Sequence, residues 1–353
     1  MTIDLLPPWS EAKCIAWLQG HDDKTLFQTA DAVRRQVFGE EVYIRGVIEF
    51  TNHCRNRCLY CGLRAPNRKV QRYRLSSAEI LTVASRAVEF GIHTIVLQGG
   101  EDPAYRSEEI ADLIETIRKK YGVAITLSLG EQSAATYRLW REAGADRYLL
   151  RMETWSQELY QRLRPGRQWQ KRLECLQILH ELNYEVGSGF MVGLPGESLA
   201  DLANSIMGLT KLELDMIGIG PYLVHPETPL RYATNGSLEL TLRTLALVRI
   251  LNPLANMPST SAMECARRGG RLRGLQVGMN VIMPSLTPEN VKELYRIYPG
   301  KNAQSDSVEH SVAAVQQMIT AAGYHWSDSI GMSPNWLRRN RKIITQSNHI
   351  TQE

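Results

Sequence analysis

The feature that most constrains how this chain folds is a regular alternation of short apolar runs with amphipathic helical segments. Runs typical of strands occur eight times, at residues 42–50, 93–98, 124–129, 146–151, 185–192, 215–220, 257–261 and 278–283. Strands that alternate with helices pair in parallel through right-handed crossovers, and eight such units close into a barrel. The sequence therefore predicts an α/β fold, a (β/α)8 TIM barrel, with an open doubly wound sheet as the alternative.

Helix signals between the runs support this alternation. Apolar residues recur at helical spacing over 77–90, and Ser76 with Glu79 has the pattern of a capping box. Gly91 is expected to end this helix, and a second helix is expected to begin at Ser107.

The length of 353 residues suits one such barrel, and no linker long enough to divide the chain is present. We expect residues 1–40 to form an N-terminal helical extension. Residues 41–323 are expected to form the barrel, with C-terminal helices at 288–297 and 308–322. Residues 324–353 are predicted to be a C-terminal tail, loose from Trp336 onward because the basic residues there follow no apolar period.

Composition and charge exclude several classes of function. The formal net charge of +4 is spread along the chain and is too mild to indicate nucleic-acid binding. No stretch reads as a signal peptide or a membrane span. Three of the six cysteines, Cys14, Cys175 and Cys265, stand alone, which argues against a disulfide framework and favours a reducing, cytoplasmic compartment.

The other three cysteines, Cys54, Cys58 and Cys61, lie directly after the first predicted strand. Three thiolates are one too few for a closed tetrahedral zinc site, but they suit an iron–sulfur cluster with one iron left open. Two weaker alternatives are a zinc site completed by His53 and three incidental core cysteines. The polar residues between the cysteines are unlike a core, so we favour the cluster.

Polar and glycine-rich residues follow the predicted strands, where barrel enzymes place their sites. Each alone also fits a tight turn or an exposed loop, and His225 alone fits local hydrogen bonding. The glycines within 187–196 do not open a helix as a dinucleotide site requires. As a set, these strand ends predict one cavity, lined by Gly99, Gly100, Glu101, Ser128, Glu131, Arg151 and Glu153.

With these segments assembled, the chain resembles radical S-adenosylmethionine (SAM) enzymes and, among them, the HydE family of [FeFe]-hydrogenase maturases. This subgroup also holds biotin synthase and methylornithine synthase. The likeness covers about residues 41–301 and includes the runs 95–103, 126–131, 144–151, 191–196, 218–221 and 280–284. It implies a [4Fe–4S] cluster on Cys54, Cys58 and Cys61, whose open iron takes SAM so that reductive cleavage yields a 5′-deoxyadenosyl radical.

The resemblance also implies which residues contact SAM and substrate. Tyr60 is expected by the adenine, Gly100 and Glu101 by the methionyl amino group, and Ser128 by the polar end. Further SAM contacts are expected from Glu153, Arg172, Met191, Gly193 and Leu194. Contacts to a small anionic, amino-acid-like substrate are expected from Arg151, Met152, Thr260, Ser261, Met263 and Tyr298.

Two departures from the family pattern bear on function. Met152 stands where HydE proteins usually carry a histidine, so it is either pocket packing or the mark of a paralogue with another substrate. No cysteine follows Cys265, so we predict a single cluster.

The sequence is compatible with three functions. The favoured one is a radical SAM enzyme of the HydE type that acts on a small amino-acid-like or organometallic substrate in hydrogenase cofactor maturation. The alternatives are a carbon-skeleton rearrangement like that of methylornithine synthase and a non-catalytic iron–sulfur or metal-cofactor scaffold. The favoured function implies an external one-electron donor and other maturation proteins as partners, but neither nucleic acid nor a membrane.

Overall fold

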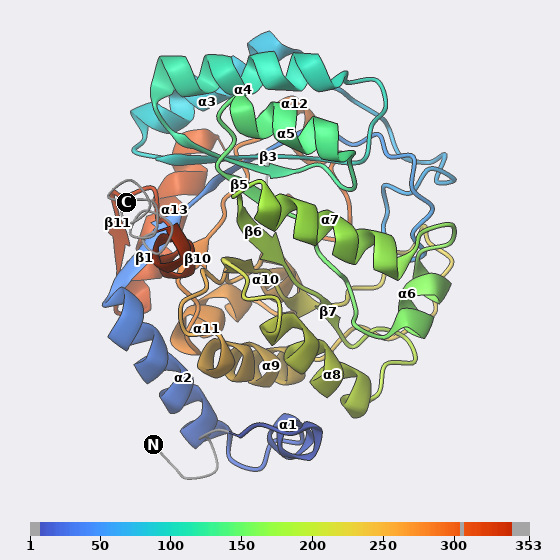
Figure 1. The fold of residues 1–353 in the computed structure, drawn as a ribbon, viewed down its shortest axis with the longest axis vertical. Helices are drawn as coiled ribbons and strands as arrows, with labels where there is room; N and C mark the ends of the chain where they lie inside the picture. Colours follow the sequence, from blue (N-terminus) through green and yellow to red (C-terminus); the bar gives the residue numbers. More distant parts are fainter. Residues whose placement is uncertain (1–7, 304–306, 341–353) are drawn as a thin grey trace, which may run out of the picture.

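A computed structural model describes residues 8–303 and 307–340 (Figure 1). The chain opens with two helices, α1 (Glu11–Leu18) and α2 (Asp23–Phe38), which pack against α8 (Leu199–Thr210) and α9 (Leu238–Leu251). Both opening helices begin at a polar N-cap, Ser10 or Asp22, whose side chain accepts a backbone N–H of the first turn. Two segments within the predicted N-terminal extension, residues 11–18 and 23–38, are therefore helical.

Parallel strands form the main sheet in sequence order. The strands are β2 (Gly46–Thr51), β3 (Thr94–Gly99), β4 (Ala124–Ser128), β5 (Arg147–Leu149), β6 (Glu185–Ser188) and β8 (Met216–Ile217). Four of the predicted runs, at 93–98, 124–129, 146–151 and 185–192, coincide with β3, β4, β5 and β6 to within a few residues. A separate two-stranded sheet is formed by β7 (Met191–Val192) and β9 (Gly220–Pro221), which pair in parallel.

Isolated bridges close this sheet into a barrel. Met216 pairs with Asn256, Pro258 with Val281, and Val47 with Ser285, all in parallel. Between them, β10 (Val281–Ile282) pairs with β1 (Glu41–Ile44). The predicted (β/α)8 barrel is confirmed, with two local corrections: the first predicted strand splits at Arg45 into β1 and β2, and 257–261 forms bridges only, because Ser261 already starts a helix.

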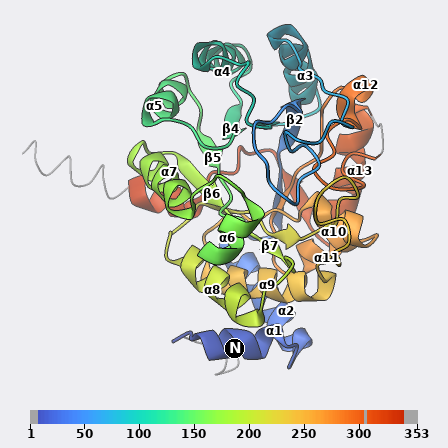
Figure 2. The same cartoon turned by 90° about the vertical axis from the view of Figure 1, so that its right-hand side faces the viewer.

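Helices surround the sheet (Figure 2). They are α3 (Ser77–Glu89), α4 (Ser107–Tyr121), α5 (Ala134–Glu142), α6 (Gln157–Leu163), α7 (Trp169–Glu181), α10 (Ser261–Ala266), α11 (Gly270–Gln276), α12 (Glu289–Lys292) and α13 (Val308–Ala321). The predicted capping box of Ser76 and Glu79 is confirmed at α3. The helix expected over 288–297 is short, since only Glu289–Lys292 is helical.

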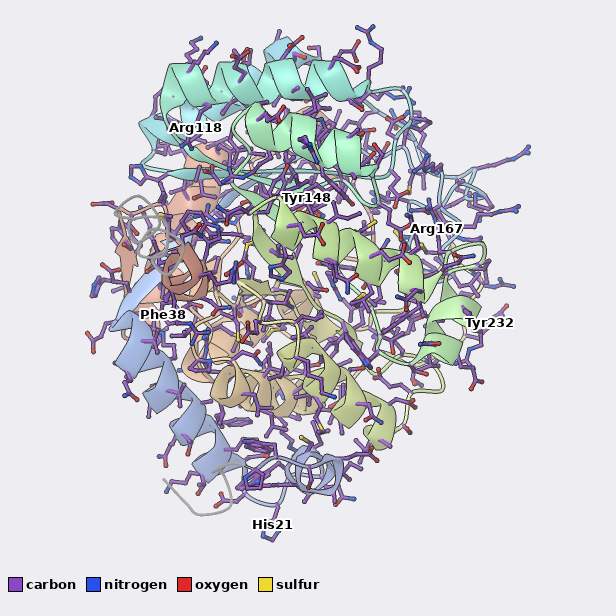
Figure 3. The ribbon with its side chains drawn as sticks, in the orientation of Figure 1. His21, Phe38, Arg118, Tyr148, Arg167 and Tyr232 are labelled. Atoms are coloured by element: carbon purple, nitrogen blue, oxygen red, sulfur yellow. The ribbon has the colours of Figure 1, made fainter. Side chains whose placement is uncertain are left out.

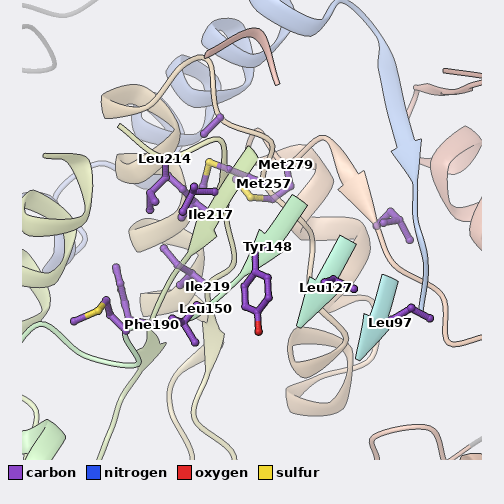
Figure 4. Packing of buried hydrophobic residues seen from close by; sticks show 14 of the residues in the cluster. Leu97, Leu127, Tyr148, Leu150, Phe190, Leu214, Ile217, Ile219, Met257 and Met279 are labelled. Carbon is purple, nitrogen blue, oxygen red and sulfur yellow. The ribbon is translucent and has the colours of Figure 1, made fainter. Parts of the chain in front are cut away.

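Apolar side chains fill the space between the sheet and the helices. Leu97, Leu127 and Tyr148 are paired in register on adjacent strands and fully buried, so they form one row across the sheet (Figure 4). Tyr148 meets Tyr137 of α5 edge to face, with ring centroids 5.0 Å apart. The other side of the strands faces the barrel interior, where Val47 and Leu149 line a cavity.

The C-terminal segment closes the opposite end of the barrel. β11 (His325–Ser327) pairs with β1 in parallel, and Ser333 is fully buried. Residues 334–340 are helical, and Arg339 forms an ion pair of 2.6 Å with the buried carboxylate of Asp215. The prediction of a loose tail from Trp336 is therefore wrong up to residue 340, because the tail's cation has a buried partner that its own sequence does not reveal; residues 341–353 lie outside the described part. Among the described residues, no helix is long and apolar enough to cross a membrane.

Candidate functional site

One cavity of about 330 Å³ lies where the loops that follow the barrel strands meet. The loop that follows β2 carries the cysteines; it lies at the right of Figure 1 and toward the viewer in Figure 2. Most side chains predicted for the site line this one cavity although they come from eight different segments. They are Cys54, Cys58, Tyr60, Cys61, Gly100, Glu101, Ser128, Arg151, Glu153, Arg172, Met191, Thr260, Ser261 and Tyr298.

Five of the predicted site residues do not line the cavity, among them Glu131, which forms ion pairs with Arg167 and Arg172 instead. Met152 and Met263 are buried within the hydrophobic core, so their thioethers serve packing. Leu194 belongs to a small apolar cluster with Leu163 and Tyr222, and Gly193 donates its N–H to the carboxylate of Glu197. Leu194 supports the cavity wall, because Met191 and Tyr60 pack on the same apolar cluster.

The cysteine loop is anchored at several points by hydrogen bonds to distant segments. Asn52, at the end of β2, donates to the carbonyl of Leu294 at 2.9 Å, and Arg55 N–H donates to Glu101 O at 2.9 Å. Further along, Leu59 N–H donates to Leu163 O at 2.9 Å, which ties the loop to the end of α6. A loop so fixed holds its cysteines in place before any ligand binds.

Two glycines are required by the close packing of this loop. A Cβ at Gly100 would lie 2.1 Å from the carbonyl oxygen of His53, and one at Gly62 would lie 2.2 Å from that of Arg296. Real side chains do not approach so closely, so a larger residue at Gly100 would push the cysteine loop off the end of β3.

The three thiols share one electrostatic environment. Burial raises the pKa of Cys61, and the neighbouring Cys58 and Cys54 raise it further. Burial also raises the pKa of the Cys54 thiol. Without a ligand the Cys54 and Cys61 thiols are therefore held neutral, and bound metal would displace their protons.

The arrangement of these thiols can be compared with the two metal chemistries considered for them. Within residues 8–303 and 307–340, no three His, Cys, Asp or Glu side chains converge on one point as ligands of a single ion. An iron–sulfur cluster does not require such convergence, since each thiolate binds a different iron. Three thiols that line one cavity and influence one another fit a cluster better than a zinc ion.

Beside the cysteine loop lies a buried group of acids and arginines. Arg167, labelled in Figure 3, forms ion pairs with Glu101 at 2.6 Å and with Glu131 at 3.2 Å. Its Nε also donates to Asn56 Oδ1, between Cys54 and Cys58, at 2.7 Å. Although burial alone would raise the pKa of Glu101, hydrogen bonding from Asn56 and the charges of Arg167 and Arg172 lower it. Glu101 is therefore ionised and holds the loop through Arg167.

Most of the hydrogen-bond donors of Arg172 already bind other residues of the protein. Its Nε lies 2.8 Å from Glu131 Oε1, and its Nη1 donates to Arg151 O at 2.6 Å. Only Nη2, 4.0 Å from Glu101 Oε1, has no close acceptor. The expected SAM contact of Arg172 is thus restricted to one nitrogen of its fork.

Arg164 is a site residue that the sequence analysis missed. It lines the cavity, is 4% exposed, and lies beside the ring of Tyr160, 5.2 Å from its centroid. Within the described part of the chain its Nε has no hydrogen-bond partner and no carboxylate forms an ion pair with it. A buried guanidinium without an anion is costly, so this cation is suited to an anionic group of a ligand.

Glu153 has a backbone conformation that is unusual for its residue type. Its φ is +70°, in the left-handed region that favours glycine. Its N–H donates to Gly189 O, and Met191 N–H donates to its carbonyl, each at 3.0 Å. These bonds hold the strained residue in the cavity wall, 3.2 Å from Arg151 Nη2.

Hydroxyl groups and an ion pair line the part of the cavity formed by the last strands. Ser261 Oγ lies 2.8 Å from Tyr298 OH, and Lys301 Nζ lies 2.8 Å from Glu49 Oε1. Burial alone would lower the pKa of Lys301, but the charge of Glu49 raises it. The sequence analysis missed this pair because Glu49 sits inside an apolar strand run and Lys301 lies about 250 residues away.

His225 takes the ordinary role that a loop histidine usually has. Its Nδ1 accepts the N–H of Glu227 at 3.1 Å, and burial lowers its pKa. Its other nitrogen faces Gly62, so the neutral ring packs under the cysteine loop.

The chain is similar in sequence and in fold to several known proteins. Residues 48–207 match the family model of the radical SAM superfamily. The chain is 48% identical over 301 residues to the [FeFe] hydrogenase maturase subunit HydE of Thermotoga maritima, covering 85% of this chain and 86% of that protein. It is 30% identical over 270 residues to 3-methylornithine synthase of Methanosarcina acetivorans, covering 76% and 75% of the two chains. The crystal structure of methylornithine synthase (PylB) superimposes with a TM-score of 0.79 at 24% identity, covering 90% of this chain and 94% of the other, which supports the barrel fold.

Proposed function

Because this chain belongs to the radical SAM superfamily and, within it, to the HydE family, we propose that it acts on a small amino-acid-like or organometallic substrate during hydrogenase cofactor maturation. Enzymes of this superfamily use a [4Fe–4S] cluster with SAM, whose reductive cleavage supplies a 5′-deoxyadenosyl radical. The observation that carries the proposal is one cavity that is lined by three cysteines, by cations and by hydroxyl groups.

The protein's part in this chemistry begins with the cluster loop. Cys54, Cys58 and Cys61 would hold the cluster, and the hydrogen bonds of Asn52, Arg55 and Leu59 fix their positions. The Arg167–Glu101 ion pair holds the middle of the loop. Rigid ligands keep the cofactor oriented toward the cavity and limit access of water.

SAM would lie across the cavity wall formed by the middle strands. Arg164 and the free nitrogen of Arg172 would bind its carboxylate, because a guanidinium fork matches that group. Gly100 and Glu101 would face its amino group, as the family pattern implies. Tyr60, Ser128, Glu153 and Met191 would contact the rest of SAM, with Leu194 supporting Met191 and Tyr60 in the cavity wall.

The substrate would occupy the remaining part of the cavity. Thr260, Ser261, Tyr298 and Arg151 provide hydroxyl groups and a cation, and Lys301 adds a second cation. These groups suit a small molecule with a carboxylate or another anionic group. Met152 and Met263 would act only through packing, so the exchange of histidine for methionine at position 152 leaves the cavity lining unchanged. This favours a HydE-type substrate over a different one.

The proposed partners follow from the same reaction. Reductive cleavage requires an external one-electron donor, and the HydE relative is named as a subunit of the [FeFe] hydrogenase maturase. Other maturation proteins are therefore expected as partners. The six free cysteines, three of them in the cluster loop, favour the reducing cytoplasm.

Production of 5′-deoxyadenosine tests this proposal. Anaerobically reconstituted protein is expected to form it from SAM on reduction by dithionite, and product analysis with candidate substrates would separate HydE-type chemistry from a carbon-skeleton rearrangement. Cys58→Ala is expected to abolish both iron binding and SAM cleavage, whereas Cys175→Ala and Cys265→Ala retain them. Absence of 5′-deoxyadenosine from wild-type protein of full iron content would leave only the scaffold function.

A further inference from the structure

The segment that carries the cysteines is strongly basic. Residues 50–78 contain seven arginines and lysines and no aspartate or glutamate, although the whole chain has a net charge of only +4. The even spread of charge expected from the overall composition is therefore wrong for this segment. Its cations are Arg55, Arg57, Arg64, Arg68, Lys69, Arg72 and Arg74.

Four of these cations have partners within the protein. Arg55 pairs with Glu101, and Arg74 pairs with Asp102 at 2.7 Å. Arg64 donates to Cys58 O at 3.1 Å, and Arg72 donates to Leu63 O at 3.0 Å. These four side chains stabilise the conformation of the loop. Their presence is therefore explained without a binding partner.

The other three cations have no such role. Arg57, Arg68 and Lys69 are exposed, and within residues 8–303 and 307–340 their side chains form neither an ion pair nor a hydrogen bond. Three unpaired cations on one loop repel one another and add nothing to folding stability. Their presence is explained if they meet a negatively charged partner.

Their position indicates what that partner does. Arg57 lies between Cys54 and Cys58, directly before Cys58 in the chain. Cys58 is 8% exposed, and the other two cysteines are half-buried, so the thiols lie just beneath this surface. A protein that docks on a surface that includes Arg57 therefore comes close to whatever the adjacent Cys58 holds.

We propose that Arg57, Arg68 and Lys69 form the docking surface for an acidic one-electron carrier protein. The inference rests on the proposed function, because the electron is needed only if the cysteines hold a cluster. On docking, the reduced carrier passes one electron to the cluster and leaves oxidised by one electron, with no bond made or broken in the transfer. Complementary charge steers such an encounter and raises its rate. A nucleic acid would also be attracted, but it would gain nothing from lying beside the thiols.

Binding and reduction by an acidic two-cluster bacterial ferredoxin test this surface. The triple variant Arg57→Glu, Arg68→Glu, Lys69→Glu is expected to bind the ferredoxin at least about tenfold more weakly than wild type at low ionic strength. Calorimetry would measure the Kd, and stopped-flow bleaching would measure the rate of cluster reduction, which should fall similarly. The wild-type advantage should shrink as salt is added.

Two controls make the result specific. The triple variant Arg86→Glu, Arg138→Glu, Lys211→Glu makes the same change of charge at exposed cations elsewhere and should bind the ferredoxin as wild type does. Dithionite needs no docking surface, so both triple variants should form 5′-deoxyadenosine with it at the wild-type rate per loaded cluster. Arg68→Glu, Lys69→Glu alone avoids the residue next to Cys58 and should show a smaller loss of the same kind, even if cluster loading is poor in the triple variant.

Each contrary result is informative. The docking surface is rejected if wild type does not bind the ferredoxin, if the loop variants bind as wild type does, or if the control triple variant loses as much. It is also rejected if single-stranded DNA binds and competes the ferredoxin away while reduction continues unchanged. Failure of wild type with dithionite would instead overturn the proposed function itself.

Discussion

The two ends of the barrel both bury arginines and acids, but they use them differently. At the end away from the cysteines, Arg147 pairs with Glu185 at 3.1 Å, and Arg45 donates to Gly331 O at 3.0 Å. The C-terminal segment supplies the Gly331 carbonyl and a second carbonyl that accepts from Arg147. It also supplies Arg339, which forms an ion pair with Asp215. At the cysteine end, Arg164 lines a cavity and, among the described residues, forms no ion pair with a carboxylate.

This difference separates stability from function. Buried charges that are fully paired specify the fold, whereas removal of one partner leaves an expensive unpaired charge. Arg45 also forms no ion pair within residues 8–303 and 307–340, but it does not line the cavity, whereas Arg164 does, and a buried cation that faces a cavity can be paired by a ligand. The barrel is therefore sealed at one end and prepared for an anion at the other.

The largest expected effect concerns the sealed end. Asp215 is fully buried and accepts from Val186 N–H at 2.8 Å, from Ser333 Oγ at 3.1 Å and from Arg339. Asp215→Ala is expected to lower the free energy of unfolding by about 3 kcal/mol, because three donors lose their acceptor. Urea denaturation would measure the loss, and SAM affinity of the folded protein should not change. A loss below about 1 kcal/mol would show that this end is not held by charge pairing.

The second prediction concerns the open end. Arg164→Gln is expected to weaken SAM binding about 10- to 100-fold, the loss of a charge-assisted hydrogen bond worth about 1.5–3 kcal/mol. Stability should change little, because no partner loses a bond. Calorimetric titration of reconstituted protein would measure the Kd, with Arg162→Gln as the control, since that exposed neighbour donates only to Pro195 O. A variant that binds SAM as wild type does but unfolds more easily would place Arg164 with the structural charges.

The smallest expected effect is a pH dependence at the open end. Burial raises the pKa of Glu197, which accepts from Gly193 N–H, from 4.5 to about 7. Between these values the native protein keeps a proton that the unfolded chain has released, so stability falls as pH rises through this window. Glu197→Gln should match wild type near pH 4.5 and be more stable by about 1–2 kcal/mol at pH 8.

Denaturation curves at several pH values would test this prediction. The exposed Glu181 gives a matched control, because Glu181→Gln removes the same charge without a buried site. Equal stability of wild type and Glu197→Gln at pH 8 would mean that Glu197 titrates like an ordinary acid.

Local patterns made much of the fold and site predictable from sequence. The apolar strand β3 and the capping box of α3 depend on residues close together in the chain, so both were located correctly. The three cysteines and the residues at strand ends were expected in one cavity, and all of them except Glu131 line one. Met152 and Met263 were misplaced because one residue's shift along a chain segment turns a side chain from cavity to core.

The sequence by itself determined the alternation of strands and helices, the cysteine loop and the family, because each is written in neighbouring residues. Only the tertiary structure decided that Arg339 reaches Asp215, that Lys301 reaches Glu49, and that Arg164 forms no ion pair in the part of the chain that the structure describes. Each of these facts depends on how segments far apart in the chain meet around a closed barrel. The role of a buried charge depends on which groups pair with it, and here those groups come from segments far apart in the chain.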